Sequence, residues 1–344
     1  LSLEYMPKWF HKYVTVVSVK ANKKAILAKY PKVSYWANPE EINTASLKRK
    51  WLFENSKADD FFFINDETRL YTSIGDGKAR GARDVPHDFA EHVQRLEELS
   101  NYYIGVAANQ KLFSNGLLKS HAMVRENYVL GTWFHWNRKF ALSRLELDRV
   151  NYCDDVDYVL QALRMGYRVC NYGGILYEHR TTTPQRQHND RTVEIQERDT
   201  KKLIKMHPDC ISRKPDYDPV TQDIGIAIKF SPAYQPRRKV VIAYSENTRR
   251  EALACYLMLM KLKKNISVKA VRLDMEPKTE GKNANKQTLS HLREMGYPSP
   301  GINEVPATVR TMNMAEVVFT FSKADVKLAK SMFPRTPDRY QVME

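Results

Sequence analysis

The sequence predicts an α/β protein with two domains, and three observations support this. Apolar segments rich in β-branched residues alternate with amphipathic segments from residue 13 to residue 107, which is the order of a doubly wound sheet. A polar stretch with several prolines, residues 181–238, interrupts the alternation, which resumes at residues 239–244. The length of 344 residues suits about two domains. We therefore expect one domain at 1–200, a linker or extension at 201–238, and a smaller domain at 239–344.

Three strands are expected near the amino end. Residues 13–19 are β-branched and apolar, and residues 33–36 follow a short helix at 21–28 that ends before Pro31. A second helix, expected at 43–56, leads to the apolar run Phe61–Ile64, which is typical of a strand buried on both faces. The β-α-β-α-β order predicts that these strands run parallel in one sheet.

The rest of the first domain continues in the same style. The glycine-rich and basic segment 68–84 is expected to be a mobile loop that could close over a charged substrate. Apolar spacing predicts helices at 87–99, 159–165 and 193–206, with Gly166 ending the second of them, and strands at 102–107 and 169–176.

The smaller domain is also expected to alternate strands with helices. The expected strands are 239–244, 267–273 and 317–321, and the expected helices are 249–262, 286–295 and 324–332.

Composition restricts the function classes. The net charge of +15 predicts attraction to a polyanion, such as nucleic acid, an anionic membrane surface or a charged substrate. The four cysteines are scattered without a C-x-x-C pair, so neither a zinc site nor a disulfide framework is expected. No stretch approaches 18 uninterrupted apolar residues and the first residues lack a signal-peptide pattern. We expect a cytoplasmic protein, in the host cytoplasm if the source is viral, without a membrane partner.

Oxygen-bearing side chains follow the strand at Phe61–Ile64 directly. Asn65, Asp66 and Glu67 would lie at its carboxyl end, where open α/β sheets bind ligands. Such side chains suit Mg²⁺ or Mn²⁺, which commonly bridge substrate phosphates. An acidic turn after a strand is the alternative interpretation.

Other candidates are acidic, aromatic or basic. Asp154, Asp155 and Asp157 open a helix, where they could also serve only the helix dipole or an N-cap. Side chains that could contact nucleic acid lie in the loop and in the aromatic segment 119–140, where about half of the aromatics are expected in the core. These nucleic-acid candidates are Lys78, Arg80, Arg83, Trp133, His135, Trp136 and Arg138.

Together these motifs resemble the GT-A glycosyltransferases over residues 13–180. Asn65-Asp66-Glu67 resembles that family's D-x-D motif, and Asp154-Asp155-Val156-Asp157 resembles its E-D-x-D element. His179 matches the late metal-binding histidine, and Arg49 resembles the arginine of the A-R-N element. The sequence departs from the family at Asn65, where Asp is frequent, and at Asp154, where Glu is usual. The resemblance implies a GT-A nucleotide-diphospho-sugar transferase domain.

The resemblance also implies roles for individual residues. A nucleotide sugar, such as a UDP-sugar, would contact Ser18, Lys20, Arg49, Asn65 and Asp66. Mn²⁺ or Mg²⁺ held by Asp66, Glu67 and His179 would neutralise the departing diphosphate. Asp155 is the preferred general base, with Asp154 second, and both an inverting and a retaining route stay open.

The acceptor is expected to be a hydroxymethylated pyrimidine in double-stranded DNA. The positive charge and the resemblance to the GT-A branch that modifies bases in phages and kinetoplastids motivate this hypothesis. A protein, polysaccharide or small-molecule acceptor is the alternative, as is a DNA-binding scaffold without activity.

The smaller domain resembles a second family. Residues 244–250 resemble the C-x5-R loop of low-molecular-weight tyrosine phosphatases and arsenate reductases, with Asn247 and Arg250 matching. Tyr244 replaces the nucleophilic cysteine and cannot act as a thiolate. The resemblance therefore implies a degenerate, Rossmann-like phosphatase domain. Its loop could still hold a phosphate, or the domain could serve only packing or docking.

Overall fold

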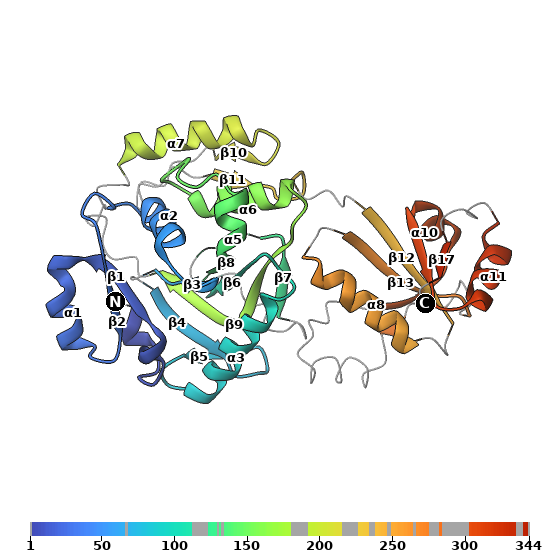
Figure 1. The fold of residues 1–344 in the computed structure, drawn as a ribbon, viewed down its shortest axis with the longest axis horizontal. Helices are drawn as coiled ribbons and strands as arrows, with labels where there is room; N and C mark the ends of the chain where they lie inside the picture. Colours follow the sequence, from blue (N-terminus) through green and yellow to red (C-terminus); the bar gives the residue numbers. More distant parts are fainter. Residues whose placement is uncertain are drawn as a thin grey trace. The chain divides into compact units, whose positions relative to one another are not determined.

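The computed structural model describes most of the chain and divides it into two compact units (Figure 1). Unit 1 comprises Leu1–Ser100, Ile104–Met165 and Val169–Ala233, and unit 2 comprises Asn101–Tyr103, Gly166–Arg168 and Tyr234–Glu344. Residues 201–233 therefore belong to unit 1. The described residues are 2–65, 68–111, 123–128, 131, 134–179, 192–214, 226–233, 238–245, 249–263, 266–274, 282–283, 303–334 and 340–342.

Unit 1 combines helices with three sheets. Its described strands are β1 (Thr15–Val19), β2 (Ser34–Asn38), β3 (Asp60–Phe63), β4 (Thr68–Ser73), β5 (Ala79–Gly81), β6 (Gly105–Gln110), β7 (Val124–Glu126), β8 (Phe134–Asn137), β9 (Val169–His179), β10 (Ile211–Arg213) and β11 (Ile226–Ile228). Its described helices are η1 (Ser2–Tyr5), η2 (Phe10–Tyr13), η3 (Lys20–Asn22), α1 (Lys23–Lys29), α2 (Ala45–Asn55), α3 (Pro86–Leu99), α5 (Arg138–Arg144), α6 (Asp154–Arg164) and α7 (Val193–Met206). The predicted helices of this part of the chain are confirmed.

The main sheet of unit 1 has seven strands in the order β3-β8-β6-β9-β4-β5, with β7 paired to β9. β6 and β9 are parallel, and β8 is antiparallel to both β3 and β6. β3 therefore runs in the same direction as β6 and β9, so the carboxyl ends of these three strands reach one edge of the sheet. β4 is antiparallel to β9 and begins at that edge.

The prediction of one parallel sheet is right for the first two strands and wrong for the third. β1 and β2 pair in parallel in a sheet of their own, whereas β3 pairs antiparallel with β8. The ring of Phe63 stacks on that of Phe134, its partner in the ladder, with centroids 5.0 Å apart. Such aromatic cross-strand pairs stabilise a particular strand pairing. The apolar run Phe61–Ile64 therefore predicted a buried strand but did not identify the strand that pairs with it.

The segment predicted as a mobile loop is instead mostly a hairpin. β4 and β5 pair antiparallel, and the turn between them contains Gly75, Asp76 and Gly77, all with positive φ. Along β4, Leu70 and Thr72 are buried while Arg69 is exposed, which is the period-two pattern of a half-buried strand. Gly75 and Gly77 lie in the turn, whereas Gly81 ends β5.

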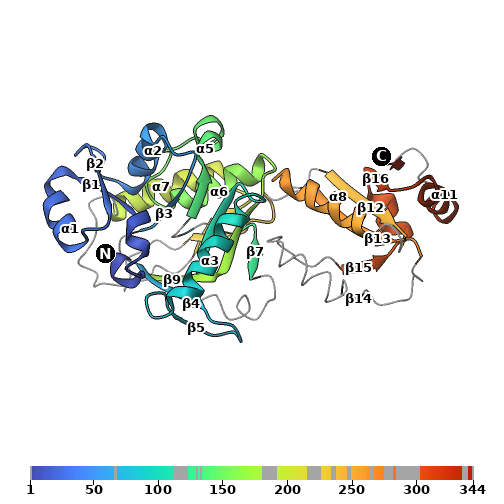
Figure 2. The same cartoon turned by 60° about the horizontal axis from the view of Figure 1, so that its bottom comes forward.

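The core of unit 1 lies under α3. This helix packs on β4, β6 and β9, and its buried residues are Phe89, Leu96 and Leu99. Figures 1 and 2 both show α3 lying against β4 and β9. α6 contacts β9 as well.

Unit 2 contains a six-stranded sheet in the order β14-β15-β13-β12-β16-β17. All of its pairs are parallel except β14 with β15, and the parallel strands β15-β13-β12-β16-β17 have the order 3-2-1-4-5 of Rossmann-like doubly wound folds. The strands are β12 (Arg238–Tyr244), β13 (Ile266–Arg272), β14 (Lys282–Asn283), β15 (Asn303–Pro306), β16 (Val317–Thr320) and β17 (Tyr340–Val342), and the described helices are α8 (Arg249–Lys261), α10 (Val309–Met314) and α11 (Lys323–Met332).

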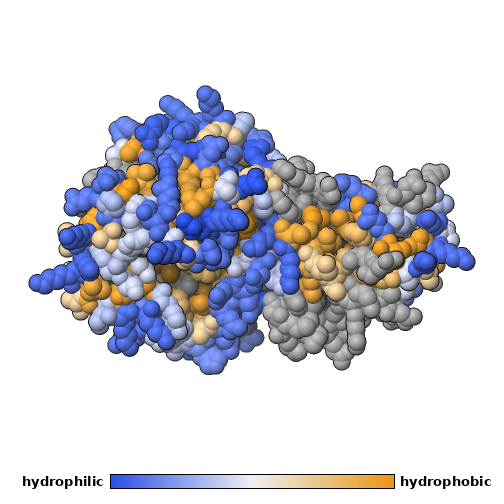
Figure 3. All heavy atoms as spheres, viewed as in Figure 1, coloured by the Kyte–Doolittle hydropathy of each residue, from blue (hydrophilic) through white to orange (hydrophobic). Residues whose placement is uncertain are grey.

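The α/β fold class is therefore confirmed for the chain, and unit 2 is Rossmann-like. Its predicted strands are confirmed, as are the helices near α8 and α11, while the helix expected at 286–295 lies outside the described residues. Figure 3 shows hydrophobic side chains gathered over α8, where Met258 and Leu262 are exposed. Among the helices that the structure describes, none has the length and apolar character needed to cross a membrane.

Gly174 in β9 provides a test of the packing under α3. A Cβ at this position would lie 2.4 Å from His92 Nδ1 and 2.4 Å from the Tyr172 ring. Those two groups are fixed, since the Tyr172 hydroxyl donates to His92 Nδ1 (2.6 Å) and His92 Nε2 donates to the Ser73 carbonyl (3.1 Å). We expect Gly174→Ala to lower the free energy of unfolding by about 1–3 kcal/mol, measured by urea denaturation.

A matched control is Gly75→Asn in the hairpin turn. Nothing lies within 4 Å of a Cβ there, and asparagine tolerates the positive φ. We expect a change of no more than about 0.5 kcal/mol. Equal stability of Gly174→Ala and the wild type would contradict this description of the packing.

Candidate functional site

The candidate site lies at the edge where β3, β6 and β9 end, here called the carboxyl edge. Asn65 follows the end of β3, Gln110 ends β6, and His179 ends β9. Asp66 and Glu67 lie outside the described residues, and only the backbone of His179 is described. Ligands bind open α/β sheets at this kind of edge.

The ladder between β4 and β9 brings two predicted metal-binding segments alongside each other. Thr68 pairs with His179 in this antiparallel ladder, and Thr68 is the residue after Glu67 in the sequence. Cα atoms paired in this way lie about 5 Å apart. In the ladder, the backbone of His179 therefore lies opposite the residue that directly follows the acidic motif in the sequence.

The hydroxyl of Ser2 bonds to Asn65 and Thr68, the residues on either side of Asp66 and Glu67 in the sequence. The Ser2 hydroxyl donates to the Asn65 carbonyl and accepts a hydrogen bond from the Thr68 N–H (3.0 Å). The Thr68 hydroxyl also donates to the Asn65 carbonyl, at 3.1 Å. Ser2 and Thr68 are both buried, so the start of β4 is held firmly behind the carboxyl edge.

A buried ion pair joins α2 to α6. The Arg49 guanidinium donates to the Asp154 carboxylate, and the side chains are only 9% and 7% exposed. The guanidinium carbon also lies 4.9 Å from the centre of the Phe134 ring, which stacks on Phe63 at the end of β3. The structure thus places the predicted Arg49 and Asp154 together, close to the end of β3.

This pairing corrects two predicted roles. Asp154 was the second candidate for the general base, but its carboxylate is buried and engaged by Arg49. Arg49 was expected to contact the nucleotide sugar, but its guanidinium is buried between Asp154 and the Phe134 ring. Both residues are structural partners, because a buried charge is stable only beside its counter-charge.

Asp155 differs from its neighbours on α6. It is half-buried, and its Oδ1 accepts a hydrogen bond from the Val156 N–H at 2.9 Å. Its carboxylate lies in the first turn, where the helix dipole favours a negative charge. Its role as a general base stays a prediction.

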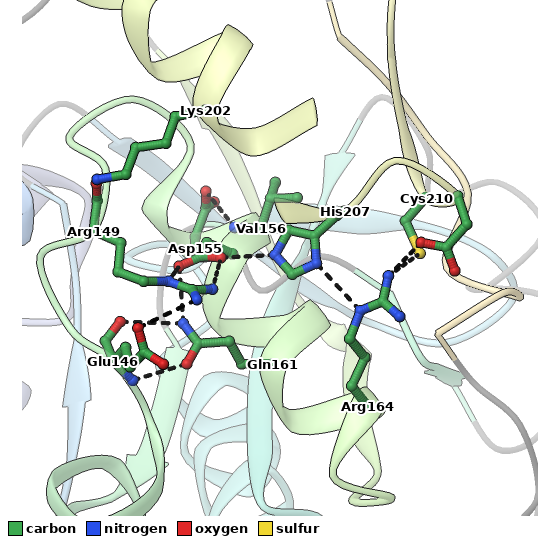
Figure 4. A network of polar contacts seen from close by, with 11 residues as sticks. Glu146, Arg149, Asp155, Val156, Gln161, Arg164, Lys202, His207 and Cys210 are labelled. Carbon is green, nitrogen blue, oxygen red and sulfur yellow. Dashed lines mark hydrogen bonds and ion pairs between the residues drawn. The ribbon is translucent and has the colours of Figure 1, made fainter. Parts of the chain in front are cut away.

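Asp157 is the centre of a buried polar network, and Figure 4 labels its partners Arg149, Gln161 and His207. Its Oδ2 accepts from Arg149 Nε (3.0 Å) and from Gln161 Nε2 (2.8 Å), and its Oδ1 accepts from His207 Nε2 (2.8 Å). Burial raises the pKa of Asp157, but the hydrogen bonds from His207 and Arg149 outweigh burial, so the net pKa lies below its ordinary value. Asp157 is therefore ionised and structural.

The same network extends from α6 to the end of α7. The second ring nitrogen of His207, Nδ1, accepts from Arg164 Nε at 3.3 Å, and Arg164 also contacts Asp209 and Cys210. Sequence reasoning missed His207, which lies 50 residues from Asp157. One sequence signal could have indicated such a partner. Asp157 lies on the apolar face of a helix, and a carboxylate buried there needs a cation or a hydrogen-bond donor beside it.

Two predicted contacts of the nucleotide sugar lie in the two-stranded sheet. Ser18, near the end of β1, accepts a hydrogen bond from Asn22 Nδ2 (3.0 Å), and Lys20 is exposed at the start of η3. The predicted parallel arrangement required β1 and β3 to lie in one sheet. The structure instead places β1 in a two-stranded sheet with β2 and β3 in the main sheet. Their role in binding the donor stays a prediction.

Two of the predicted nucleic-acid contacts are wrong. His135 and Trp136 in β8 are each only 1% exposed, so neither can stack on a base. His135 Nε2 lies 2.6 Å from Asp60 Oδ1, and Trp136 stacks on Phe140. They belong to the part of the aromatic segment that forms the core.

The remaining predicted nucleic-acid contacts have mixed positions. Lys78, Arg80 and Arg83 are exposed in or next to the β4–β5 hairpin, at one border of the main sheet. Arg138 is half-buried and donates from Nε to the Phe53 carbonyl at 2.6 Å. Trp133 lies outside the described residues.

The predicted phosphate loop of unit 2 is described only at its borders. Asn247 lies outside the described residues, and of Arg250 only the backbone, at the start of α8, is described. Tyr244, at the end of β12, is 3% exposed, so its phenol is buried.

Metal-binding capacity can be judged only for the described residues. Among them, no group of three His, Cys, Asp or Glu side chains is arranged to hold a metal ion. The predicted ligands Asp66 and Glu67 are not part of that set.

Comparison with known proteins gives little beyond this geometry. No family model matches the sequence, and no curated protein matches it. Solved structures with weak similarity include a low molecular weight protein tyrosine phosphatase from Bacillus subtilis, with 18% identity over 30% of this chain and 69% of that one at a TM-score of 0.26.

Two further similarities are of the same kind. They are to YwlE arginine phosphatase from Geobacillus stearothermophilus (18% identity, 30% of this chain, 66% of that one, TM-score 0.27) and a low molecular weight phosphotyrosine phosphatase from Vibrio cholerae O395 (12%, 30%, 69%, TM-score 0.26). Similarity this weak carries no argument about the activity of this chain.

The buried ion pair can be measured by a double-mutant cycle. Arg49→Met or Asp154→Asn alone leaves a buried group without its partner, so we expect each to lower the free energy of unfolding by about 3–5 kcal/mol. The double variant should lose clearly less than the sum, measured by urea denaturation. The exposed pair Lys29–Glu4 is the control, since Lys29→Met should cost less than about 1 kcal/mol. Additive losses at Arg49 and Asp154 would show that the two side chains do not interact.

The lowered pKa of Asp157 predicts a pH dependence. A carboxyl group whose pKa is lower in the folded state stabilises the fold above its unfolded pKa of about 3.9 and loses this effect as pH falls through the folded value. Asp157→Asn should therefore be less stable than the wild type at pH 7, and the difference should shrink below about pH 4. Denaturation at a series of pH values measures this, and a constant difference down to pH 2 would contradict it.

Proposed function

We propose that unit 1 is a divalent-cation-dependent glycosyltransferase that moves a sugar from a nucleotide diphosphate sugar, such as a UDP-sugar, to a hydroxyl acceptor. The observation that carries the proposal is the convergence at the carboxyl edge. The register of Thr68 with His179 and the contact of Arg49 with Phe134 bring three separate candidate segments to the ends of β3 and β9. This arrangement supports a shared site for the acidic motif, the late histidine and the start of α6.

The proposed cation would be held by Asp66, Glu67 and His179. Two carboxylates and one imidazole are a donor set that suits Mn²⁺ or Mg²⁺. A bound ion of this kind would neutralise the negative charge of the diphosphate leaving group. The Ser2 hydroxyl forms hydrogen bonds with Asn65 and Thr68, the described residues that flank Asp66 and Glu67 in the sequence.

The proposed general base is Asp155. A base must take the proton from the acceptor hydroxyl as that oxygen attacks the anomeric carbon opposite the leaving group. Because Arg49 engages Asp154, Asp155 is the carboxylate that stays half-exposed in the first turn of α6. Attack from the face opposite the diphosphate would invert the anomeric centre.

The proposed acceptor is a hydroxymethylated pyrimidine in double-stranded DNA. The net charge of +15 and the exposed Lys78, Arg80 and Arg83 support binding to a polyanion. A base inside a duplex must be brought out of the stack before its hydroxyl can react. With His135 and Trp136 buried, neither serves as a stacking platform for that base.

Transfer can be tested with the full chain, a panel of UDP-sugars, Mn²⁺ and hydroxymethylated duplex DNA. We expect nucleosides whose mass has increased by one sugar, and no product with EDTA or with Asp66→Ala, since the leaving group would not be neutralised. Asp76→Ala, in the exposed hairpin turn, should keep wild-type activity. Undiminished transfer by Asp66→Ala would rule out the proposed metal site.

Binding to DNA can be tested separately. Replacement of Lys78, Arg80 and Arg83 by glutamine should weaken binding to duplex DNA and reduce the slope of log affinity against log salt by about one for each lost phosphate contact. Hydrolysis of the UDP-sugar without DNA should be unchanged. Equal salt slopes for the variant and the wild type would exclude this hairpin from the DNA-binding surface.

A further inference from the structure

The loop before α6 has an unusual backbone. Asp148 (φ 65°) and Cys153 (φ 58°), at the two ends of this loop, are both in the left-handed region, and neither is a glycine. Residues with a Cβ adopt that region at a cost in free energy, and they persist there only where the surroundings hold them. We call residues 148–153 the α6 entry loop.

A carboxylate from α7 holds the middle of the α6 entry loop. Asp199 Oδ2 accepts hydrogen bonds from the N–H groups of Asn151 (2.7 Å) and Tyr152 (3.0 Å). Asp199 is 1% exposed, and its other oxygen accepts from Arg198 Nε at 2.9 Å. Two backbone donors on one buried carboxylate oxygen are a strong and directional restraint.

Other side chains restrain the loop from both flanks. Lys202 of α7 donates to the Arg149 carbonyl (2.6 Å), as Figure 4 shows. Lys50 of α2 lies 2.7 Å from Asp148, and the hydroxyl of Thr44, which caps α2, donates to Asn151 Oδ1 at 3.3 Å. The loop is thus held between α2 and α7, and Asp199 is the only one of these restraints that engages two of its backbone amides.

The loop conformation determines where α6 begins. The Cys153 carbonyl accepts the first bonds of the helix, from the N–H groups of Val156 (3.1 Å) and Asp157 (3.2 Å). The direction of that carbonyl therefore sets the direction of the first turn, which carries Asp155. A change of backbone at Cys153 would rotate Asp155 away from its position.

We infer that Asp199 is a positioning residue for Asp155. This inference rests on the proposed glycosyltransferase function, and it assigns to α7 a role in the reaction that no sequence motif indicates. Asp199 acts through the backbone of the α6 entry loop and touches neither substrate. A general base must lie within hydrogen-bond reach of its proton, so a small rotation of Asp155 would slow the chemical step without weakening donor binding.

Two variants test the inference in the full chain. Asp199→Asn weakens the restraint on the loop, and Cys153→Gly releases the backbone strain while leaving Asp199 in place. Lys263→Gly is the matched control, since Lys263 is also left-handed (φ 52°) but lies in unit 2. The measurements are hydrogen exchange of the Asn151 and Tyr152 amides, the melting temperature, and kcat and donor KM for transfer to hydroxymethylated DNA.

We expect the two amides to exchange at least about tenfold faster in Asp199→Asn, because a weakened restraint allows local opening. The kcat should fall at least about tenfold with donor KM nearly unchanged. Cys153→Gly should melt no lower than the wild type, because glycine adopts the positive φ of this position without strain, and Lys263→Gly should keep wild-type kcat. A purely structural role would lower the melting temperature and leave kcat unchanged.

The outcomes separate the inference from the proposed function. Unchanged amide exchange in Asp199→Asn would overturn the restraint itself. Faster exchange with wild-type kcat in Asp199→Asn would overturn the positioning role. A wild-type protein without transfer activity would overturn the proposed function, and the positioning role with it, while faster amide exchange in Asp199→Asn would still support the restraint.

Discussion

The buried ion pair between Arg49 and Asp154 is the constraint on which the candidate site depends. Each charge has lost most of its hydration, so each is stable only while the other is in place. The pair fixes the start of α6 to α2, and through the Phe134 ring it reaches β8 and the end of β3. The first turn of α6 is therefore placed relative to the carboxyl edge by electrostatics as well as by packing.

The three aspartates that open α6 have different environments although they are close in sequence. Asp154 and Asp157, three residues apart, lie on one face of the helix and are both buried against cations. Asp155 is rotated away from that face and stays half-buried. Two carboxylates of the first turns of α6 are therefore buried in ion pairs, while the one between them keeps part of its exposure to solvent.

The segment that follows the main sheet, α7 with His207, also holds the start of α6 in place. α7 contributes Asp199 and Lys202 to the α6 entry loop, and His207 directly after it completes the network around Asp157. Unit 2 has its own sheet and its own core, and Tyr244 at the end of β12 is buried.

The sequence by itself determined which segments form helices and strands wherever one physical signal dominates. The β-branched run of β12 and the apolar spacing of α3 and α7 predicted those elements, and the polar stretch before residue 239 predicted that a separate unit follows. It also placed Asn65, Asp154 and Asp155 beside strand or helix ends. Local patterns carry such information because hydrophobic period and capping act over a few residues.

Only the tertiary structure decided which segments meet. The pairing of β3 with β8, the ion pair of Asp154 with Arg49 and the hydrogen bond of Asp157 with His207 join residues separated by 50 to 105 positions in the chain. An aspartate at a helix start has the same local pattern whether it caps the helix, binds a cation or acts as a base. Its environment distinguishes these roles, because long-range contacts set its burial and its counter-charge.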